Sequence, residues 1–158
     1  MKNFKLLTAL LASALVVSAC SSSSDDAGGS GGAITVAYQN DIATLDPAIG
    51  YDWQNWSIIK SLFSRLLDYE PGTTDLVPSL ATEAPEISSD GLTYTFKLHS
   101  GVKFHNGREL TADDVKYSIE REVNPKTMSP GAGYFGMIKG YEEVTAGKVT
   151  TLSGVEVI

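Results

Sequence analysis

A run of small polar residues near the start of the chain limits where a fold can begin. Residues 21–32 contain Ser, Asp and Gly with a single Ala. Such residues bury too little apolar surface to offset the entropy lost on ordering, and Gly- and Ser-rich segments behave as flexible coil. We therefore expect the folded part of the chain to begin at Ala33 and this run to form a tether.

The segment before the tether has the pattern of a secretory signal peptide. Residues 1–5 carry two lysines, and residues 6–17 are apolar apart from one Thr and one Ser. A charged start, a short apolar stretch and small residues after it are typical of a cleaved leader. A helix over this stretch would be about 18 Å long, too short to cross a hydrocarbon core of about 30 Å. Residues 1–19 are therefore predicted to be a signal peptide rather than a buried core helix.

The single cysteine, Cys20, lies at the junction between these two segments. A lone cysteine cannot form a disulfide within its own chain, so a free thiol or an intermolecular bridge is the simplest use of it. The sequence "VSAC" resembles instead the lipobox of bacterial lipoproteins, whose cysteine receives a diacylglyceryl group after cleavage of the leader. Several acyl chains hold a domain at a membrane surface, whereas one chain binds marginally. We expect lipidation of Cys20, with residues 20–32 as the anchor and its flexible tether.

The composition of the chain excludes one class of partner. The formal net charge is −7 at pH 7, and nucleic-acid binding requires an excess of Lys and Arg to neutralise phosphates. We therefore expect no nucleic acid as partner. The sequence from Ala33 onward is long enough for one domain with a hydrophobic core, and it holds no further stretch that would span a membrane.

Periodicity in the first half of the folded part predicts a strand and a helix. Residues 33–38 alternate β-branched and aromatic side chains with small ones, which predicts a strand. Apolar residues over 52–67 recur at helical spacing and form one stripe. Asp52 is the expected N-cap of this helix, and Pro71 with Gly72 is expected to end it.

Turn signals in the middle of the chain predict two hairpins. Residues 89–91 read Ser-Asp-Gly and precede an alternating strand over 92–98. The strand's core-facing side chains are expected to be Tyr94, Phe96 and Leu98. Residues 101–104 predict a further short strand and 105–107 a further turn.

The last part of the chain predicts a capped helix followed by shorter elements. Thr111 and Asp114 form a variant capping box that opens a helix, with Val115 and Ile119 on its apolar stripe. A long loop is expected over 124–133, a short helix over 134–146 and a strand over 149–158. The sequence stops inside this apolar strand, and an unpaired apolar edge invites aggregation, so we expect the chain to be truncated there.

Candidate catalytic and metal-binding patterns are weak. Residues 131–136 match G-x-G-x-x-G but follow a Pro-containing loop rather than a buried strand, so a flexible loop is favoured over a nucleotide site. His99 and His105 are better explained by a solvated hairpin than by a metal, and Asp113 with Asp114 by helix capping than by catalysis. We expect no catalytic residue, no metal and no cofactor.

Two stretches carry a resemblance to a known family. "LDPAIGYD" (residues 45–52), and then the ordered run from "LFSRLLDYEPG" to "DDVKYSIERE" (62–122), resemble the family 5 extracytoplasmic solute-binding proteins. These are the dipeptide, oligopeptide and nickel-type receptors of bacterial ABC importers. The resemblance runs from about Ile34 to the end and is densest over 76–122. His99 departs from it, because the family often has Arg or Lys there.

The resemblance implies an α/β fold class, with an α+β arrangement in the part present. Family members have a periplasmic-binding-protein-like type II fold, in which two lobes joined by a hinge are accompanied by an extra lobe. Residues 33–50 would supply the first strand and loop of the hinge-linked lobe. Residues 51–158 would supply most of the extra lobe, so the fold would be incomplete in this chain.

The resemblance also implies a function. Such proteins clamp a solute between lobes that close by hinge motion and deliver it to permease subunits. We expect a monomeric, non-enzymatic receptor for peptides, nickel, haem or sugar oligomers, with peptides favoured, held outside the cytoplasm as a membrane-anchored lipoprotein. The alternatives are a surface lipoprotein that acts by protein–protein contact and an extracytoplasmic hydrolase. The implied ligand-binding residues are Gly50, Tyr51, Asp52, Trp53, Gly131 and Tyr134.

For Trp53 and its neighbour Trp56, simple helix packing remains an alternative to ligand contact.

Overall fold

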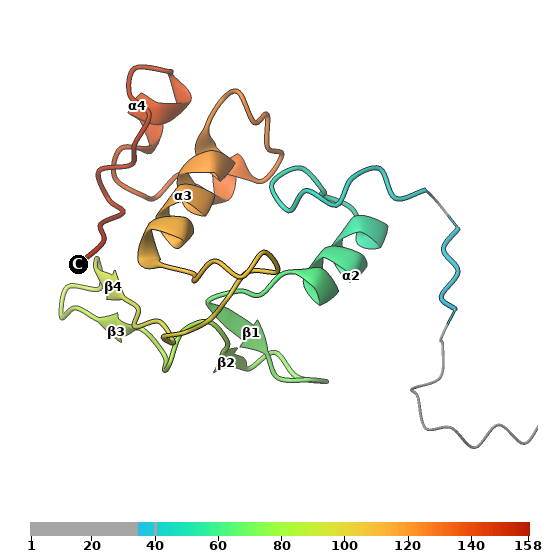
Figure 1. Ribbon diagram of the computed structural model, residues 1–158. Coiled ribbons are helices and arrows are strands. Elements are labelled where there is room, and N and C mark those ends of the chain that lie inside the picture. Colours follow the sequence, from blue (N-terminus) through green and yellow to red (C-terminus); the bar gives the residue numbers. More distant parts are fainter. Residues whose placement is uncertain (1–34, 40) are drawn as a thin grey trace, which may run out of the picture. The chain divides into compact units, whose positions relative to one another are not determined.

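The computed structural model describes residues 35–39 and 41–158 (Figure 1). The predicted signal peptide, Cys20 and the tether lie outside the described residues. One compact unit comprises Tyr38–Ile158 and is described here by itself. No helix among the described residues has both the length and the apolar character needed to cross a membrane.

The compact unit combines helices with two small antiparallel sheets. Strand β1 pairs with β2, and β3 pairs with β4. In chain order the elements are α2 (Trp53–Leu62), β1 (Leu67–Tyr69), β2 (Leu76–Pro78), β3 (Glu86–Ile87), β4 (Tyr94–Thr95), α3 (Ala112–Val123), the 3₁₀ helix η1 (Ala132–Phe135) and α4 (Tyr141–Thr145).

Helix α2 begins where the sequence predicts but ends earlier. Asp52 is its N-cap, as expected, and the cap carboxylate accepts a hydrogen bond from the backbone N–H of Asn55 at 2.9 Å. The prediction that the helix continues to residue 67 is wrong. The carbonyl oxygens of Arg65 and Leu66 accept backbone hydrogen bonds of 2.8–3.1 Å from residues 79–81, which holds this segment extended. Pairing with residues 79–81 thus overrides the apolar periodicity.

Pro71 and Gly72 lie in the turn between β1 and β2 instead of ending a helix. Gly72 has a φ of +80°, a conformation that glycine adopts without steric cost.

Both predicted hairpins form, but their strands are shorter than expected. Of the strand expected over 92–98, only Tyr94–Thr95 is a strand, and the strand expected over 101–104 is reduced to a single bridge at Lys103. The N–H of Gly91 donates to the carbonyl of Ser88 at 2.8 Å in the turn between β3 and β4. An isolated bridge between Lys103 and Glu109 closes the second hairpin. The prediction that Tyr94 faces a core is wrong, because 56% of its surface is exposed on an open hairpin face. Phe96 and Leu98 are half-buried, in line with the prediction.

The capping box of α3 is confirmed. The N–H of Thr111 donates to the carboxylate of Asp114 at 2.9 Å. The same carboxylate accepts two hydrogen bonds from the Arg108 guanidinium, at 2.7 and 2.9 Å. This guanidinium holds the pKa of Asp114 well below its usual value, so the cap stays ionised.

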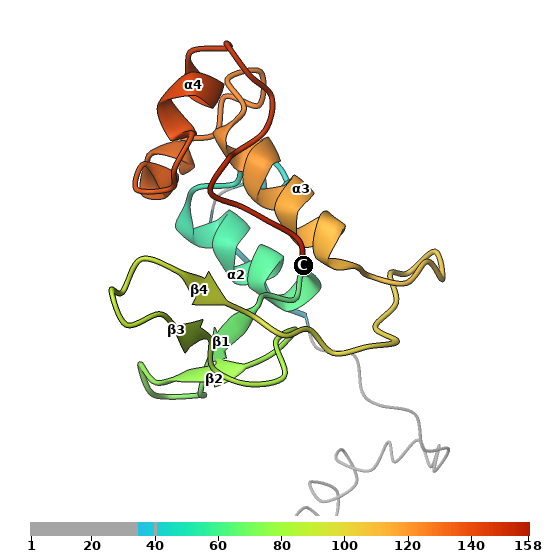
Figure 2. The same ribbon diagram turned by 90° about the vertical axis from the view of Figure 1, so that its left-hand side faces the viewer.

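The main core lies between α3, α4 and the C-terminal segment, and η1 packs beside α3 (Figure 2). Val123, Val144 and Leu152 each expose only 1% of their surface. Ile119 on α3 packs against them, which confirms its place on the apolar stripe. Of the short helix expected over 134–146, only Tyr141–Thr145 is α-helical, as α4, and residues 134 and 135 belong to η1.

Two predicted strands are absent from the described residues. Residues 35–38 are irregular and exposed, and 149–158 form loops and turns. A strand needs a partner for its backbone groups, and no described strand pairs with either segment. In the C-terminal segment other groups take that role. The N–H of Leu152 donates to the Glu120 carboxylate at 2.9 Å, and that of Gly154 to the Lys139 carbonyl at 2.9 Å.

Candidate functional site

Asp46 organises the turn that leads into the predicted solute-binding segment. Its carbonyl accepts hydrogen bonds from the N–H groups of Ile49 at 3.1 Å and Gly50 at 2.8 Å. Its carboxylate accepts from the N–H of Ala48 at 3.0 Å, and its own N–H donates to the Thr44 hydroxyl at 3.0 Å. These bonds fix the direction in which the chain enters Tyr51 and α2.

Arg121 of α3 ties this turn to the rest of the unit. Both terminal nitrogens of its guanidinium donate to the Asp46 carboxylate, Nη1 at 2.8 Å from Oδ1, across 75 residues of sequence. The two side chains are 33% and 28% exposed, so solvent screens the pair only in part. The guanidinium lowers the pKa of Asp46, and the carboxylate raises that of Arg121. Sequence reasoning missed Arg121, because nothing local distinguishes it from other charged residues on a helix.

Gly50 and Asp52 have structural roles in the described residues. Gly50 is buried, and a Cβ built there would lie 2.5 Å from Cδ1 of Ile59, so the absence of a side chain at Gly50 leaves room for Ile59. The Asp52 carboxylate is occupied by the backbone and side-chain nitrogens of Asn55, which is itself buried. In the described residues the Asp52 carboxylate thus caps α2, and the N–H of Gly50 belongs to the Asp46 turn.

Tyr51 and Tyr134 meet although 83 residues separate them. Their hydroxyls are hydrogen-bonded, and their rings stack with centroids 6.2 Å apart and an interplanar angle of 26°. The edge of one ring also meets a second aromatic side chain, since Tyr51 and Trp56 form a T-shaped pair with centroids 5.0 Å apart. The hydrogen bond between the two hydroxyls raises the pKa of Tyr51 above its usual value. The structure thus brings together one residue from each predicted solute-binding segment.

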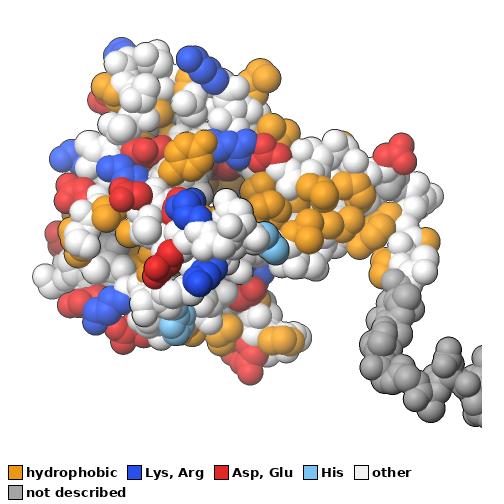
Figure 3. Space-filling view, viewed as in Figure 1, with side chains coloured by type: hydrophobic (Ala, Val, Ile, Leu, Met, Phe, Trp, Pro, Cys, Tyr) orange, Lys and Arg blue, Asp and Glu red, His pale blue; other side chains and the backbone are white. Residues whose placement is uncertain are grey.

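Trp53 does not pack against the helix as a core residue. Its side chain is 87% exposed, whereas Trp56 is 42% exposed and contacts Tyr51. The packing alternative is therefore wrong for Trp53 and partly right for Trp56. Figure 3 shows apolar side chains gathered over α2 and the segment that leads into it.

Gly131 lets η1 lie close to α3. It is buried, and a Cβ there would lie 2.7 Å from a carboxylate oxygen of Glu122. The Ser129 hydroxyl donates to the same carboxylate oxygen and accepts from the N–H of Gly131 at 3.0 Å. The carbonyl of Gly131 then accepts from the N–H of Tyr134 at 3.0 Å, which begins η1. Gly131 thus supports the position of Tyr134.

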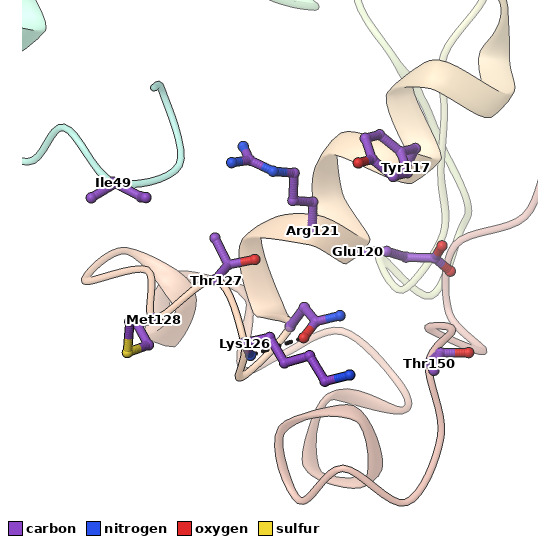
Figure 4. A pocket seen from close by; sticks show the side chains of 9 residues that line it. Ile49, Tyr117, Glu120, Arg121, Lys126, Thr127, Met128 and Thr150 are labelled. Atoms are coloured by element: carbon purple, nitrogen blue, oxygen red, sulfur yellow. Dashed lines mark hydrogen bonds between the residues drawn. The ribbon is translucent and has the colours of Figure 1, made fainter. Parts of the chain in front are cut away.

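A separate hollow of about 490 Å³ lies between the Asp46 turn, α3 and the loop after α3 (Figure 4). Its charged side chains are largely occupied, Arg121 by the Asp46 carboxylate and Glu120 by the N–H of Leu152. None of the residues predicted to bind a solute lines it. The lining consists of Ile49, Tyr117, Glu120, Arg121, Asn124, Lys126, Thr127, Met128 and Thr150.

In the part of the chain that the structure describes, no group of three His, Cys, Asp or Glu side chains is arranged to hold a metal ion. His99 and His105 are both exposed. His105 lies in the second hairpin, and His99 precedes it.

Comparison with known proteins gives consistent relatives. Residues 75–153 match the family described as bacterial extracellular solute-binding proteins, family 5 Middle. Over 73 residues the chain is 47% identical to the di/tripeptide-binding protein 4 of Pseudomonas aeruginosa. This match covers 42% of this chain and 14% of that protein. Over 72 residues it is 46% identical to the heme-binding protein A of Haemophilus influenzae. This match covers 42% of this chain and 13% of that protein.

A solved structure shares the fold. The murein tripeptide binding protein of Escherichia coli superposes with a TM-score of 0.64 at 32% identity, over 71% of this chain and 22% of that one. This likeness confirms the expected fold class, the type II fold of periplasmic binding proteins. The chain spans about a seventh of the length of the curated relatives named above. With half of its residues matched by the family profile, the chain belongs to the family 5 extracellular solute-binding proteins of bacteria.

Proposed function

We propose that this chain belongs to the solute-capturing component of a bacterial ABC importer and that its solute is a peptide. The observation that carries the proposal is the meeting of Tyr51 and Tyr134 at one exposed surface. The family resemblance assigns both to solute contact from two separate segments. Two of the relatives, from Pseudomonas aeruginosa and Escherichia coli, are by name peptide-binding proteins, which supports a peptide over haem or a metal.

The six candidate residues divide into two roles. The rings of Tyr51, Trp53 and Tyr134 are 42%, 87% and 69% exposed, so they are the groups that contact a solute. The other three residues support the segments that carry these rings. Gly50 and Gly131 allow close packing against Ile59 and Glu122, and Asp52 caps α2. A receptor that closes around its ligand by hinge motion keeps such a wall open in the free state. An extended peptide would lie along it and satisfy its own backbone groups as an added strand does.

Binding is tested on the full-length product of the gene by thermal unfolding and calorimetry with di- and tripeptides. A ligand that binds only the native state at a hundred times its Kd stabilises it by about 2.7 kcal/mol, which raises Tm measurably. Replacing Trp53 by Ala should weaken binding about tenfold, while the control Tyr94→Ala, on the remote β3–β4 hairpin, should not. Recovery of intact peptide separates a receptor from a hydrolase. The absence of any peptide-dependent change in Tm would refute the proposal.

Cys20 is proposed as the attachment point of a lipid that holds the protein outside the cytoplasm, near its permease. Its place after an apolar leader and before the Ser/Asp/Gly run supports this. The variant Cys20→Ala should move from the membrane fraction to the released fraction, while the neighbouring Ser21→Ala should stay with the membrane. Intact mass measurement should show added lipid on the wild-type protein. A membrane-bound Cys20→Ala protein together with an unmodified wild type would exclude the anchor.

A further inference from the structure

The contact between Tyr51 and Tyr134 constrains two rings that are otherwise exposed. Tyr134 lies on η1, a single 3₁₀ turn, and its ring is 69% exposed. Among the described residues, the hydroxyl of Tyr134 has one hydrogen-bond partner, the hydroxyl of Tyr51. This bond therefore fixes the orientation of both rings relative to each other.

Tyr51 is held from two directions. The face of its ring stacks on Tyr134 at a centroid distance of 6.2 Å, and its T-shaped contact with Trp56 has a centroid distance of 5.0 Å. A phenol ring held in this way loses less freedom when a ligand lies against it than a freely rotating ring does. The arrangement is that of a preorganised aromatic surface.

The polar groups around this surface contact one another or the rings. The two hydroxyls bind each other, the Asp52 carboxylate binds Asn55, and the ammonium of Lys60 lies over the Trp56 ring at 5.6 Å. An aromatic or apolar ligand group would find ring faces and edges at this surface, which are the contacts that the Tyr51–Tyr134 and Tyr51–Trp56 pairs themselves use. The surface therefore offers an aromatic or large apolar side chain more contact than it offers a small one.

Resting on the proposed function, we propose that Tyr134 is a positioning residue that holds Tyr51 against Trp56, and that this aromatic surface gives the receptor a preference for peptides with an aromatic or large apolar side chain. The rings of Tyr51 and Tyr134 both face the ligand, and the Tyr134 hydroxyl has the further role of holding the Tyr51 ring in place. Removing only the Tyr134 hydroxyl keeps the ring but frees its partner to rotate.

The test compares Ala-Phe-Ala with Ala-Ala-Ala as ligands of the full-length product of the gene, by isothermal titration calorimetry. Wild type should bind the Phe peptide more tightly. The variant Tyr134→Phe should lose about three- to tenfold of that preference, with little change in the affinity for Ala-Ala-Ala. The matched control Tyr94→Phe removes an exposed hydroxyl that has no hydrogen-bond partner among the described residues, and it should leave the preference unchanged.

A second readout does not depend on peptide binding. Because the Tyr134 hydroxyl raises the pKa of Tyr51, Tyr134→Phe should let one tyrosine ionise at lower pH in an ultraviolet titration, and Tyr94→Phe should not. Three outcomes would overturn this inference and leave the proposed function standing. They are equal binding of both peptides by the wild-type protein, an unchanged peptide preference in Tyr134→Phe, and an unchanged tyrosine titration in Tyr134→Phe. Wild-type protein that binds neither peptide would instead refute the proposed function.

Discussion

The bidentate pair between Asp46 and Arg121 should contribute measurably to stability, and a double-mutant cycle can isolate its contribution. The substitutions are Asp46→Asn and Arg121→Gln, singly and together. Asn retains a side-chain oxygen that can still accept from the N–H of Ala48, now 3.0 Å away, so this change removes the charge but not the turn. Gln at position 121 retains much of the aliphatic stem of Arg.

The expected magnitude follows from the exposure of the pair. Fully exposed ion pairs contribute about 0.2–1 kcal/mol, and removal of one partner of a buried pair costs about 3–5 kcal/mol. With side chains 33% and 28% exposed and two hydrogen bonds, each single substitution should cost about 1.5–2.5 kcal/mol. The double variant should cost much less than the sum, which leaves a coupling energy of about 1–2 kcal/mol.

Urea unfolding of the chain from Ala33 onward, monitored by circular dichroism, gives these values. At an m-value of about 1–2 kcal/mol/M, each single variant should lower the midpoint by about 1 M. The exposed pair Lys97–Glu83, whose side chains are 67% and 60% exposed, is the control, and Lys97→Gln should leave the midpoint nearly unchanged. Strictly additive effects of the two substitutions would refute the reasoning.

The pair also predicts a dependence on pH. Because the pKa of Asp46 is lowered in the folded state, its contribution is complete above the ordinary value of 3.8 and is lost as pH falls from there through the folded pKa. The free energy of unfolding of Asp46→Asn should therefore fall less steeply than that of the wild type as pH decreases below 3.8.

Two further substitutions test the packing of the unit. Leu152→Ala removes a side chain that is 1% exposed, so it should destabilise the protein by about 2–5 kcal/mol in urea unfolding. The control Leu92→Ala, at a site 82% exposed, should have little effect. Equal unfolding midpoints for the two variants would contradict the assigned core. Gly50→Ala places a methyl group 2.5 Å from Ile59 and should lower the free energy of unfolding by about 1–3 kcal/mol. The control Gly133→Ala meets no atom within 4 Å and should leave that free energy unchanged. An unchanged unfolding midpoint for Gly50→Ala would show that the turn is not close to α2.

Signals contained within a few residues predicted the structure well. The N-cap at Asp52, the capping box of α3 and the turn at residues 89–91 all depend on contacts between neighbours, and all form as predicted. The errors concern segments whose conformation depends on distant partners. The helix expected over 52–67 stops early because residues 79–81 pair with its last part.

The candidate site shows the same division. Resemblance, not spacing, placed Tyr51 and Tyr134 in one site, since residues 83 positions apart give no local pattern. The roles of Gly50 and Gly131 emerge only in three dimensions, where each allows a close approach that a side chain would obstruct. Arg121 had no local signature and becomes visible only through its contact with Asp46.

The separation between Asp46 and Arg121 has a consequence for the order of assembly during translation. Helix α2 and the two hairpins close over short stretches and are available early. The Asp46 turn cannot acquire its ionic partner until 75 more residues have been made, which takes about 4–15 s at 5–20 residues per second. The Tyr51 ring waits still longer, for Tyr134. The two parts of the proposed ligand surface can therefore meet only after α2, both hairpins and α3 have been made.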